Sequence, residues 1–433
     1  MTTLIINGPQ KLDGVIDING AKNGVLPLIV CGLLSSDKLH LLNVPILRDV
    51  ITMIELLENY GAKIDFNQSL KQLSVSCNDL KSFYAPRTIT TKMRASIWTL
   101  APMLVRCGKA KISLPGGCAI GDKNSGARQI DLHLSLLEKM GAKINLEDHY
   151  INASVDGKLK AVNFHLNKIS VGATINAILA CVLADGTSNI SNCAIEPEIS
   201  DMCRCLLKMG AKIAGIGTRI LTITGVKELY STTHRIIPDR IEAGTYLIMA
   251  AITNGKVKVD GIDASYLQTL CTKLQEAGST LDYQDNSITL IGSPQILSVN
   301  VDTQPFPGFV TDLQAQFMSL MCLSSNTCHI TENIYDNRFM HVAELNKMGA
   351  NISIQNNIAK VSGVKKLLGT KVIASDLRAS VCLVLAALAA HGTTEINNSY
   401  HLARGYEDLV GKLAKCGISI ETDSLNLHVN LSI

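Results

Sequence analysis

The sequence predicts an α/β protein built from six repeated α+β units, because two phrases recur along its 433 residues. The first phrase is an amphipathic stretch, a glycine, usually a small residue, and a short apolar strand, as in LLEKMGAKI at 136–144. Its glycines stand at positions 61, 141, 210, 278, 349 and 417, in steps of 80, 69, 68, 71 and 68. This period is longer than that of open solenoid arrays and favours compact units.

The second phrase, a buried-looking helix followed by a turn and a strand, runs in phase with the first. It covers residues 95–113, 173–190, 244–259, 314–330 and 379–396. Because Gly or Asn commonly follows the last residue of a helix, we expect these helices to stop at Gly108, Gly186, Gly255, Asn326 and Gly392. Alternating runs such as KVKVD at 256–260 predict strands. Each unit should therefore hold two helices and several strands.

Composition excludes several classes of protein. Apolar residues make up 47% of the chain, which is enough for a large core. The formal charge of +3 and an aromatic content of 4%, without basic runs, argue against nucleic acid as a partner. No signal peptide is expected, and the longest apolar run, 379–390, is too short to span a bilayer, so no membrane partner is expected either. Thirteen cysteines without a CxxC pair predict free thiols in a reducing, cytoplasmic compartment and no metal site.

The most unusual segment is LPGGCAIGDKNSGAR at 114–128, which combines four glycines and a proline with Cys118. Such a composition predicts a surface loop. Lys123 and Arg128 are close in sequence, and neighbouring cations lower the pKa of a thiol and suit it to proton transfer. A buried, inert cysteine is the alternative. A P-loop is rejected because Asp122 follows Gly121 where Lys-Ser/Thr is required, and GIG at 215–217 lacks the third glycine of a dinucleotide fingerprint.

Polar residues recur at one phase of the repeats, at expected helix starts. Lys22 and Asn23 precede the apolar run 25–30, and Arg94 begins another helical stretch. Segments 236–242, 310–316 and 375–379 occupy matching positions, and Arg338 and Arg404 add two cations. Each charge alone is most simply a helix cap or part of a solvated face. Together they indicate helix N-termini that converge on one anionic ligand, beside a reactive thiol.

Motifs along nearly the whole chain, from residue 4 to about 429, then match a known family. They are GAKN at 20–23, MRASIW at 93–98, LPGGC at 114–118, IDLH at 130–133, SVGAT at 170–174, EPE at 196–198, PDRIE at 238–242, TD at 311–312, NRFMH at 337–341, DLRA at 376–379 and RGYE at 404–407. On these motifs the chain resembles the UDP-N-acetylglucosamine enolpyruvyl transferases.

The resemblance implies a fold and a domain arrangement. It implies a two-domain inside-out α/β barrel of six α/β units, three per domain, with the active site in the cleft between the domains. Residues 21–235 would form the domain that carries the cysteine loop. Residues 1–20 together with 236–433 would form the other domain.

The resemblance also assigns the site. Residues implied for phosphoenolpyruvate are Lys22, Asn23, Arg128, Arg338, Arg378 and Arg404: Lys22, Arg128 and Arg404 at the phosphate, Arg338 and Arg378 near the carboxylate. Residues implied for UDP-N-acetylglucosamine are Arg94, Arg128, Gln129, Ile130, Asp131, Leu132, His133, Lys168, Ser170, Val171, Asp312 and Ile334. The residues implied for catalysis are Cys118, Asp312, Lys22 and Arg404.

The implied reaction moves the enolpyruvyl group of phosphoenolpyruvate to the sugar 3-hydroxyl and releases phosphate, the first committed step toward peptidoglycan. Asp312 would accept the hydroxyl proton, and Cys118 would protonate the methylene carbon. The surrounding cations would stabilise charge that develops on the phosphate. The only partners expected are the two small-molecule substrates, with no cofactor and no metal. The epoxide antibiotic fosfomycin should alkylate Cys118.

The cysteine loop departs from the family pattern. Residues 122–126, DKNSG, lie between the segments that the family joins directly, and they account for most of the long first step of the repeat. The assignment of Arg128 assumes that these five residues are the insertion. Gln129 replaces the usual proline.

Two other functions compete with this interpretation. The sister enzyme, 5-enolpyruvylshikimate-3-phosphate synthase, shares the fold and the phosphoenolpyruvate site but lacks the loop cysteine, so Cys118 argues against it. A paralogue that binds the sugar nucleotide without catalysis is disfavoured because Lys22, Cys118, Asp312 and Arg404 are all present.

Overall fold

The computed structural model describes residues 2–114, 116 and 130–423, and these divide into two compact units. One unit comprises residues 2–19 and 238–423, and we call it the split unit. The other comprises the described residues of 20–237, and we call it the continuous unit. The chain passes from the first to the second near residue 20 and returns near residue 238. Cys118, Arg128, Gln129 and the insertion 122–126 lie outside the described residues.

Each unit contains three four-stranded sheets with one shared topology. An edge strand runs parallel to its neighbour, and the two remaining strands are antiparallel to theirs. In the continuous unit the sheets are β14(Thr232–Arg235)-β3(Leu39–Leu42)-β5(Gln72–Ser76)-β4(Lys63–Asn67), β6(Tyr84–Ala85)-β7(Lys109–Ser113)-β9(Tyr150–Ser154)-β8(Lys143–Glu147) and β10(Asn163–His165)-β11(Thr187–Ser191)-β13(Ile220–Thr224)-β12(Lys212–Ala214).

The split unit repeats this plan with strands from both ends of the sequence. Its sheets are β16(Thr280–Gln284)-β17(Ser287–Ile291)-β15(Lys256–Asp260)-β2(Asp13–Asp17), β18(Val301–Asp302)-β19(Thr327–Thr331)-β21(Ile358–Ser362)-β20(Asn351–Gln355) and β22(Lys371–Ile373)-β23(Gly392–Asn397)-β1(Leu4–Gly8)-β24(Glu421–Thr422). Strand β1 pairs with β23 and β24, with Leu4 opposite Ile396 and Thr422. The six sheets correspond to the six repeats read from the sequence.

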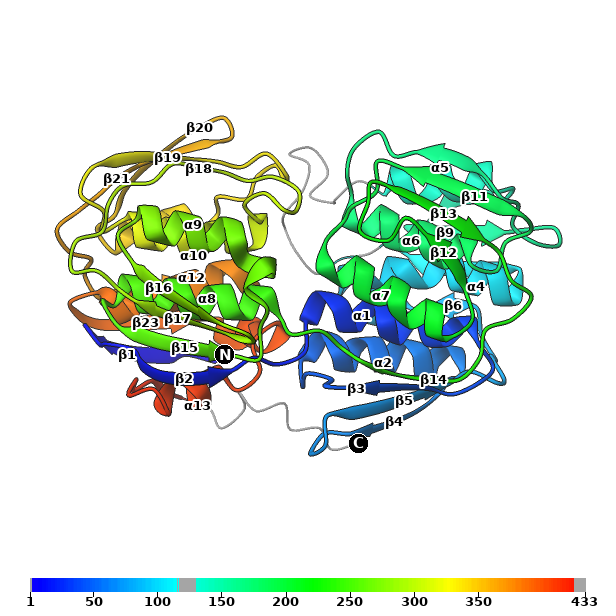
Figure 1. Cartoon of the computed structure of the whole chain (residues 1–433), viewed down its shortest axis with the longest axis horizontal. Helices are drawn as coiled ribbons and strands as arrows, with labels where there is room; N and C mark the ends of the chain where they lie inside the picture. Colours follow the sequence, from blue (N-terminus) through cyan, green and yellow to red (C-terminus); the bar gives the residue numbers. More distant parts are fainter. Residues whose placement is uncertain (1, 115, 117–129, 424–433) are drawn as a thin grey trace. The chain divides into compact units, whose positions relative to one another are not determined.

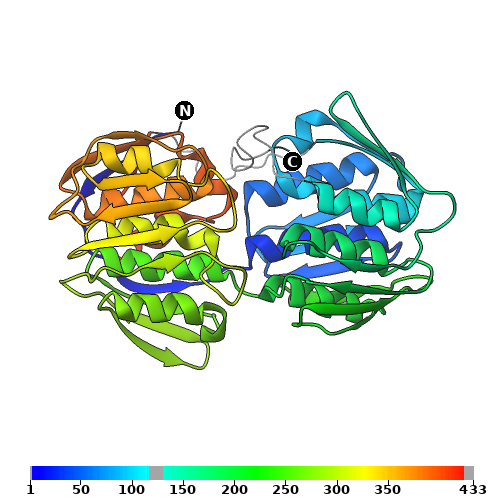
Figure 2. The same ribbon diagram turned by 90° about the horizontal axis from the view of Figure 1, so that it is seen from above.

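Two sets of helices accompany the sheets, and in both units they lie among the strands in stacked layers (Figures 1 and 2). The helices that begin the second phrase, with the equivalent first helix, are α1(Lys22–Cys31), α4(Leu100–Cys107), α6(Val171–Cys181), α8(Arg240–Ile252), α10(Gln314–Met321) and α12(Leu377–Ala389). The amphipathic helices of the first phrase are α2(Arg48–Tyr60), α5(Asp131–Lys139), α7(Pro197–Lys208), α9(Gln268–Glu276), α11(His341–Lys347) and α13(Leu409–Ala414). A short helix, α3(Arg87–Thr90), and the 3-10 helices η1(Gly32–Leu34), η2(Arg94–Thr99), η3(Ala264–Leu267), η4(Thr311–Leu313) and η5(Ser399–Arg404) complete the described elements.

The six glycines of the first phrase share one backbone conformation. Their φ angles lie between +80° and +105°, in the region that residues with a side chain avoid. Each lies at the turn between an amphipathic helix and the next strand, as the phrase predicts. The helices of the second phrase end as expected at Gly108 but earlier elsewhere: α6 ends at Cys181 and α12 at Ala389. Buried apolar residues continue past the ends of α6 and α12, so the hydrophobic pattern of the sequence does not mark where these helices end.

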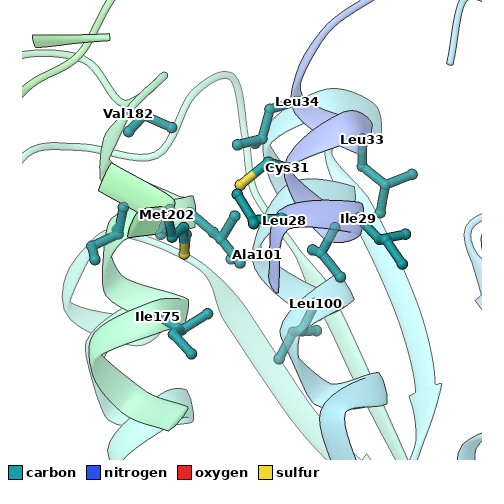
Figure 3. Packing of buried hydrophobic residues seen from close by; sticks show 14 of the residues in the cluster. Leu28, Ile29, Cys31, Leu33, Leu34, Leu100, Ala101, Ile175, Val182 and Met202 are labelled. Carbon is teal, nitrogen blue, oxygen red and sulfur yellow. The ribbon is translucent and has the colours of Figure 1, made fainter. Parts of the chain in front are cut away.

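Each unit has its own hydrophobic core. In strand β15, Val257 and Val259 are fully buried while Lys256 and Lys258, which alternate with them, are more exposed, so one face of the sheet packs inward. In the continuous unit, Leu28 of α1, Ala101 of α4 and Met202 of α7 gather in the space between their helices (Figure 3). In the described part of the chain, no helix combines the length and the apolar character needed to cross a lipid bilayer.

Candidate active site

In the split unit, the carboxylate of Asp312 holds two arginine side chains. Arg338 donates from Nη2 to Asp312 Oδ1 over 2.7 Å, and Arg378 donates from Nη2 to Oδ2 over 2.8 Å. The two arginine residues are 6% and 8% exposed, whereas the side chain of Asp312 is 22% exposed. Two guanidinium groups this close favour the ionised form of the carboxylate, which is the form that can accept a proton.

Helix starts place two of these three residues, and Arg338 lies three residues before the start of α11. Asp312 lies in η4, directly before α10, and Arg378 lies in the first turn of α12. The N-cap of α12 is Asp376, whose Oδ1 accepts from the backbone N–H groups of Arg378 and Ala379. Asp239 caps α8 in the same way. The matching polar segments of the sequence are therefore helix N-termini, as predicted.

A buried hydroxyl network joins the same helices. The Tyr406 hydroxyl lies 2.8 Å from Thr245 Oγ1 on α8 and accepts a 3.4 Å hydrogen bond from Arg378 Nη1. Gln316 on α10 donates to Thr245 Oγ1 and to the backbone carbonyl of Asp312. These hydrogen bonds join the second turn of α8 to the first turns of α10 and α12 around Arg378. Arg404 ends η5, two residues before Tyr406.

The charges in this cluster favour cationic arginines and a neutral histidine. Burial lowers the pKa of Arg338, but the carboxylates of Asp312 and Glu332 outweigh it and the net shift is upward. Burial also lowers the pKa of Arg378, but Asp312, Tyr406 and Asp239 together outweigh it and the net shift is upward. His341, 3% exposed on α11, has its pKa lowered to about 4, mainly by burial and further by Arg338, against an opposing effect of Asp376. The two arginines thus keep their positive charge at neutral pH, beside the carboxylates of Asp312 and Glu332.

In the continuous unit, the candidate residues also lie at helix starts. Lys22 and Asn23 begin α1, Arg94 begins η2, and Val171 begins α6. Lys22 Nζ pairs with Asp49 Oδ2 at 3.1 Å, and the two side chains are 14% and 5% exposed. Ser170 is the N-cap of α6 and accepts from the backbone N–H of Ala173. These are positions where backbone N–H groups and the helix dipole favour an anion.

His133 joins two of these helix starts. It lies in the first turn of α5, after Asp131 and Leu132, and it is 4% exposed. A Cβ built on Gly172 would lie 3.3 Å from His133 Nε2, so the start of α6 approaches this ring closely and glycine allows it. Burial, with a smaller contribution from Arg94, lowers the pKa of His133 to about 3. His133 is therefore neutral at physiological pH.

The structure groups the sequence-derived candidates by unit. Asp312, Arg338 and Arg378 are in contact in the split unit, which also contains Ile334 and Arg404. The continuous unit contains Lys22, Asn23, Arg94, Ile130, Asp131, Leu132, His133, Lys168, Ser170 and Val171. Lys168 is exposed in the segment before α6. Nothing is described for Cys118, Arg128 and Gln129.

Sequence reasoning assigned no role to four residues that contact the candidates or their partners: Asp49, Thr311, Glu332 and Tyr406. Asp49 is a carboxylate on an otherwise apolar face of an amphipathic helix, and that signal was available in the sequence. Glu332 follows a strand without any pattern that marks it. Among the described residues, no group of three His, Cys, Asp or Glu side chains is arranged to hold a metal ion.

Known proteins share this fold over nearly the whole chain. The enolpyruvyl transferase NikO of Streptomyces tendae superposes with a TM-score of 0.87 at 22% identity, over 97% of this chain and 98% of that one. EPSP synthase of Acinetobacter baumannii superposes with a TM-score of 0.72 at 15% identity, over 98% and 100%. Six repeated sheets in two units, with charged helix starts, are thus the mixed α/β fold of enolpyruvyl transferases.

Sequence comparison then defines the family. The sequence model described as EPSP synthase (3-phosphoshikimate 1-carboxyvinyltransferase) matches residues 6–413. Relatives in Rickettsia bellii and Rickettsia akari, both named UDP-N-acetylglucosamine 1-carboxyvinyltransferase, are 52% and 51% identical over 423 residues, which is 97% of this chain and the full length of each relative. The chain belongs to the EPSP synthase family and, within it, to the UDP-N-acetylglucosamine 1-carboxyvinyltransferases. The resemblance inferred from the motifs is confirmed.

Proposed function

We propose that this protein transfers the enolpyruvyl group of phosphoenolpyruvate to the 3-hydroxyl of UDP-N-acetylglucosamine and releases phosphate. The observation that carries the proposal is 52% identity over 97% of the chain to a relative named for this activity. The contact of Asp312 with Arg338 and Arg378 supports it, because a carboxylate between two cations suits both a proton acceptor and an anionic substrate. The product of this reaction is a precursor for peptidoglycan synthesis. We propose that the protein is located in the cytoplasm.

The proposed chemistry is addition followed by elimination. The sugar 3-hydroxyl oxygen bonds to the enol carbon, Asp312 takes the hydroxyl proton, and Cys118 gives a proton to the methylene carbon. In the second step a proton leaves the new methyl group, the double bond re-forms, and phosphate departs. A thiol is suited to this exchange because its pKa can be brought near neutrality.

The proposed substrate contacts form two sets, one for phosphoenolpyruvate and one for the sugar nucleotide. We propose that Lys22, Arg128 and Arg404 hold the phosphate of phosphoenolpyruvate, with Asn23 in the same site, and that Arg338 and Arg378 hold its carboxylate. Helix starts in the continuous unit would bind the sugar nucleotide: Arg94, Ile130, Asp131, Leu132, His133, Lys168, Ser170 and Val171, with Arg128, Gln129, Asp312 and Ile334. Fixed cations at the phosphate would stabilise the charge that develops there.

We also propose the finer architecture read from the resemblance. Each domain would be an inside-out α/β barrel of three units, with domains at 21–235 and at 1–20 plus 236–433. Supporting this, α8 is buried along its whole length, while the sheet of β15 buries one face only. The two compact units change over near residues 20 and 238.

Phosphate release tests the function directly. Purified protein given both substrates should release phosphate well above controls that lack either one. Absence of release, with the sugar nucleotide still bound, would favour a binding protein without catalysis.

A second candidate is the reaction named in the family model, with 3-phosphoshikimate as the acceptor. The same assay with that acceptor separates the two reactions. Turnover with 3-phosphoshikimate and none with the sugar nucleotide would overturn the first proposal.

A further inference from the structure

Glu332 is a buried carboxylate that accepts four hydrogen bonds and is 4% exposed. Its Oε1 accepts from Thr303 Oγ1 at 2.9 Å and from the backbone N–H groups of Ile334 and Tyr335 at 2.9 and 3.1 Å. Its Oε2 accepts from Thr311 Oγ1 at 2.7 Å. Glu332 directly follows β19. Its hydrogen bonds therefore connect the end of β19 to η4 and to the segment that precedes Arg338.

The bond to Thr311 continues to the proposed site. Arg338 donates from Nη1 to Thr311 Oγ1 over 2.6 Å, while its Nη2 donates to Asp312. A hydroxyl carries one proton, which Thr311 gives to Glu332, so its lone pairs face Arg338. The hydrogen bonds therefore run in one direction, from Arg338 through Thr311 to Glu332.

Glu242 shows what a buried carboxylate does elsewhere in the same unit. It is 3% exposed and accepts from Lys412 Nζ at 2.6 Å, from the backbone N–H of Asn19 at 3.0 Å and from Tyr246 at 3.4 Å. None of these three partners is among the proposed substrate residues. The partners of Glu332, in contrast, include Ile334 itself and, through Thr311, Arg338. Glu242 and Glu332 are therefore similarly buried and hydrogen-bonded, but only Glu332 contacts proposed substrate residues or their partners.

We propose that Glu332 is a positioning residue for the proposed reaction. Through Thr311 it fixes the guanidinium of Arg338 beside Asp312, and through its other oxygen it fixes the backbone at Ile334. The inference rests on the proposed function, because it assigns Arg338 to the carboxylate of phosphoenolpyruvate.

Two variants break the hydrogen-bond chain at different places. In Glu332→Gln the amide oxygen can keep the bonds of Oε1, but an amide N–H then faces Thr311 Oγ1, and the threonine proton loses its acceptor. In Thr311→Val the hydroxyl is removed with little change of shape. Either change should raise the KM for phosphoenolpyruvate about tenfold and change the Kd of the sugar nucleotide less than about twofold.

The double variant and the pH profile separate positioning from a purely structural role. Both changes break the same series of hydrogen bonds. The KM of the double variant for phosphoenolpyruvate should therefore exceed that of the single variants by no more than about twofold. The acid limb of the kcat profile should move to higher pH, because a displaced Arg338 stabilises ionised Asp312 less. Glu242→Gln is the matched control: it should lower the melting temperature and leave the KM and the pH profile unchanged.

The outcomes are distinguishable. A wild-type protein that releases no phosphate overturns the proposed function and this inference with it. An active wild type, together with single variants whose KM for phosphoenolpyruvate rises less than about threefold, overturns the positioning role alone. Multiplicative effects in the double variant would do the same. If Glu332→Gln fails to fold, Thr311→Val decides the question by itself.

Discussion

At the scale of single residues, the contact between Asp312 and its two arginines has two consequences. It holds the proposed base ionised, and it occupies the two cations that would receive the substrate carboxylate. Phosphoenolpyruvate must therefore share Arg338 and Arg378 with Asp312. The substrate and the base would then be drawn to the same two cations, which brings them close together.

Replacing Asp312 by Asn tests this. The variant should lose about 100-fold or more in kcat, because an amide cannot accept the hydroxyl proton. It should also lose about 2 kcal/mol or more of unfolding free energy, because two buried guanidiniums lose their anion. Phosphoenolpyruvate should then raise the melting temperature of Asp312→Asn more than that of the wild type. An equal or smaller rise would contradict the shared-cation model, and calorimetric scans of both proteins decide it.

Two buried histidines predict how stability depends on pH. The pKa values of His133 and His341 are lowered to about 3 and about 4, chiefly by burial. As the pH falls below the ordinary histidine pKa of about 6.5, the unfolded chain binds protons that the folded chain does not. Stability should therefore fall between about pH 6.5 and pH 4, by about 1.4 kcal/mol per pH unit for each histidine.

Denaturant unfolding of His341→Gln measures the contribution of one histidine. Its stability should decline less steeply than that of the wild type across the same pH window. An exposed histidine provides the comparison, and His165→Gln should leave the slope unchanged. A wild-type slope in His341→Gln would show that this ring does not bear the shifted pKa.

At the scale of elements, the repeated glycines report how the chain turns from helix to strand. Gly349 has a φ of +89°, and a Cβ added there would meet nothing within 4 Å. At Gly61, with a φ of +105°, an added Cβ would lie 2.9 Å from the backbone oxygen of Asp79 and from the backbone nitrogen of Lys81. The first position is restricted by backbone conformation alone, and the second by conformation and space together.

Alanine substitutions should separate these two causes. Gly349→Ala should cost about 1 to 2 kcal/mol of unfolding free energy, the cost of the left-handed conformation. Gly61→Ala should cost more, because backbone atoms must also move. Gly349→Asn should be milder than Gly349→Ala, since Asn adopts this conformation more readily. Equal losses at the two glycines would contradict the role of space at Gly61.

Turns and helix starts could be predicted from the sequence because local patterns mark them, whereas helix ends and distant contacts could not. The glycine phrase located six turns, and capping residues such as Asp239 and Asp376 located helix starts, because both signals lie within a few residues of the feature. Helix ends after Cys181 and Ala389 were placed too late because buried apolar residues continue beyond them. Pairs such as Lys22 with Asp49, or Thr311 with Glu332, depend on how distant segments pack, and no local pattern encodes them.

At the scale of the whole molecule, the cysteines form two classes. Eleven of the twelve described cysteines are buried, and Cys107 is exposed. Partial burial of its sulfur raises the pKa of the Cys107 thiol, with Arg106 opposing it, so its reactive thiolate is favoured only at higher pH. Cys118 lies outside the described residues, and its proposed reactivity rests on the sequence.

Labelling the intact protein tests the proposed role of Cys118. Near neutral pH, fosfomycin should give one adduct, at Cys118, and stop turnover. A general thiol reagent should reach Cys107 next, faster as the pH rises. Peptide mass spectrometry locates both adducts, with Cys107→Ser as the control that keeps turnover and its inhibition. Inhibition by fosfomycin that persists in Cys118→Ser would contradict the assignment.

The pairing of β1 between β23 and β24 has a consequence for synthesis on the ribosome. Residues 4–8 leave the exit tunnel long before their partners at 392–397 and 421–422 are translated. All the described strands of the continuous unit have been synthesised once residue 235 has emerged, so this unit can fold while β1 is still unpaired. An unpaired apolar strand is prone to aggregation. Nascent chains should therefore need a chaperone on residues 4–8 until residues 392–397 and 421–422 have emerged.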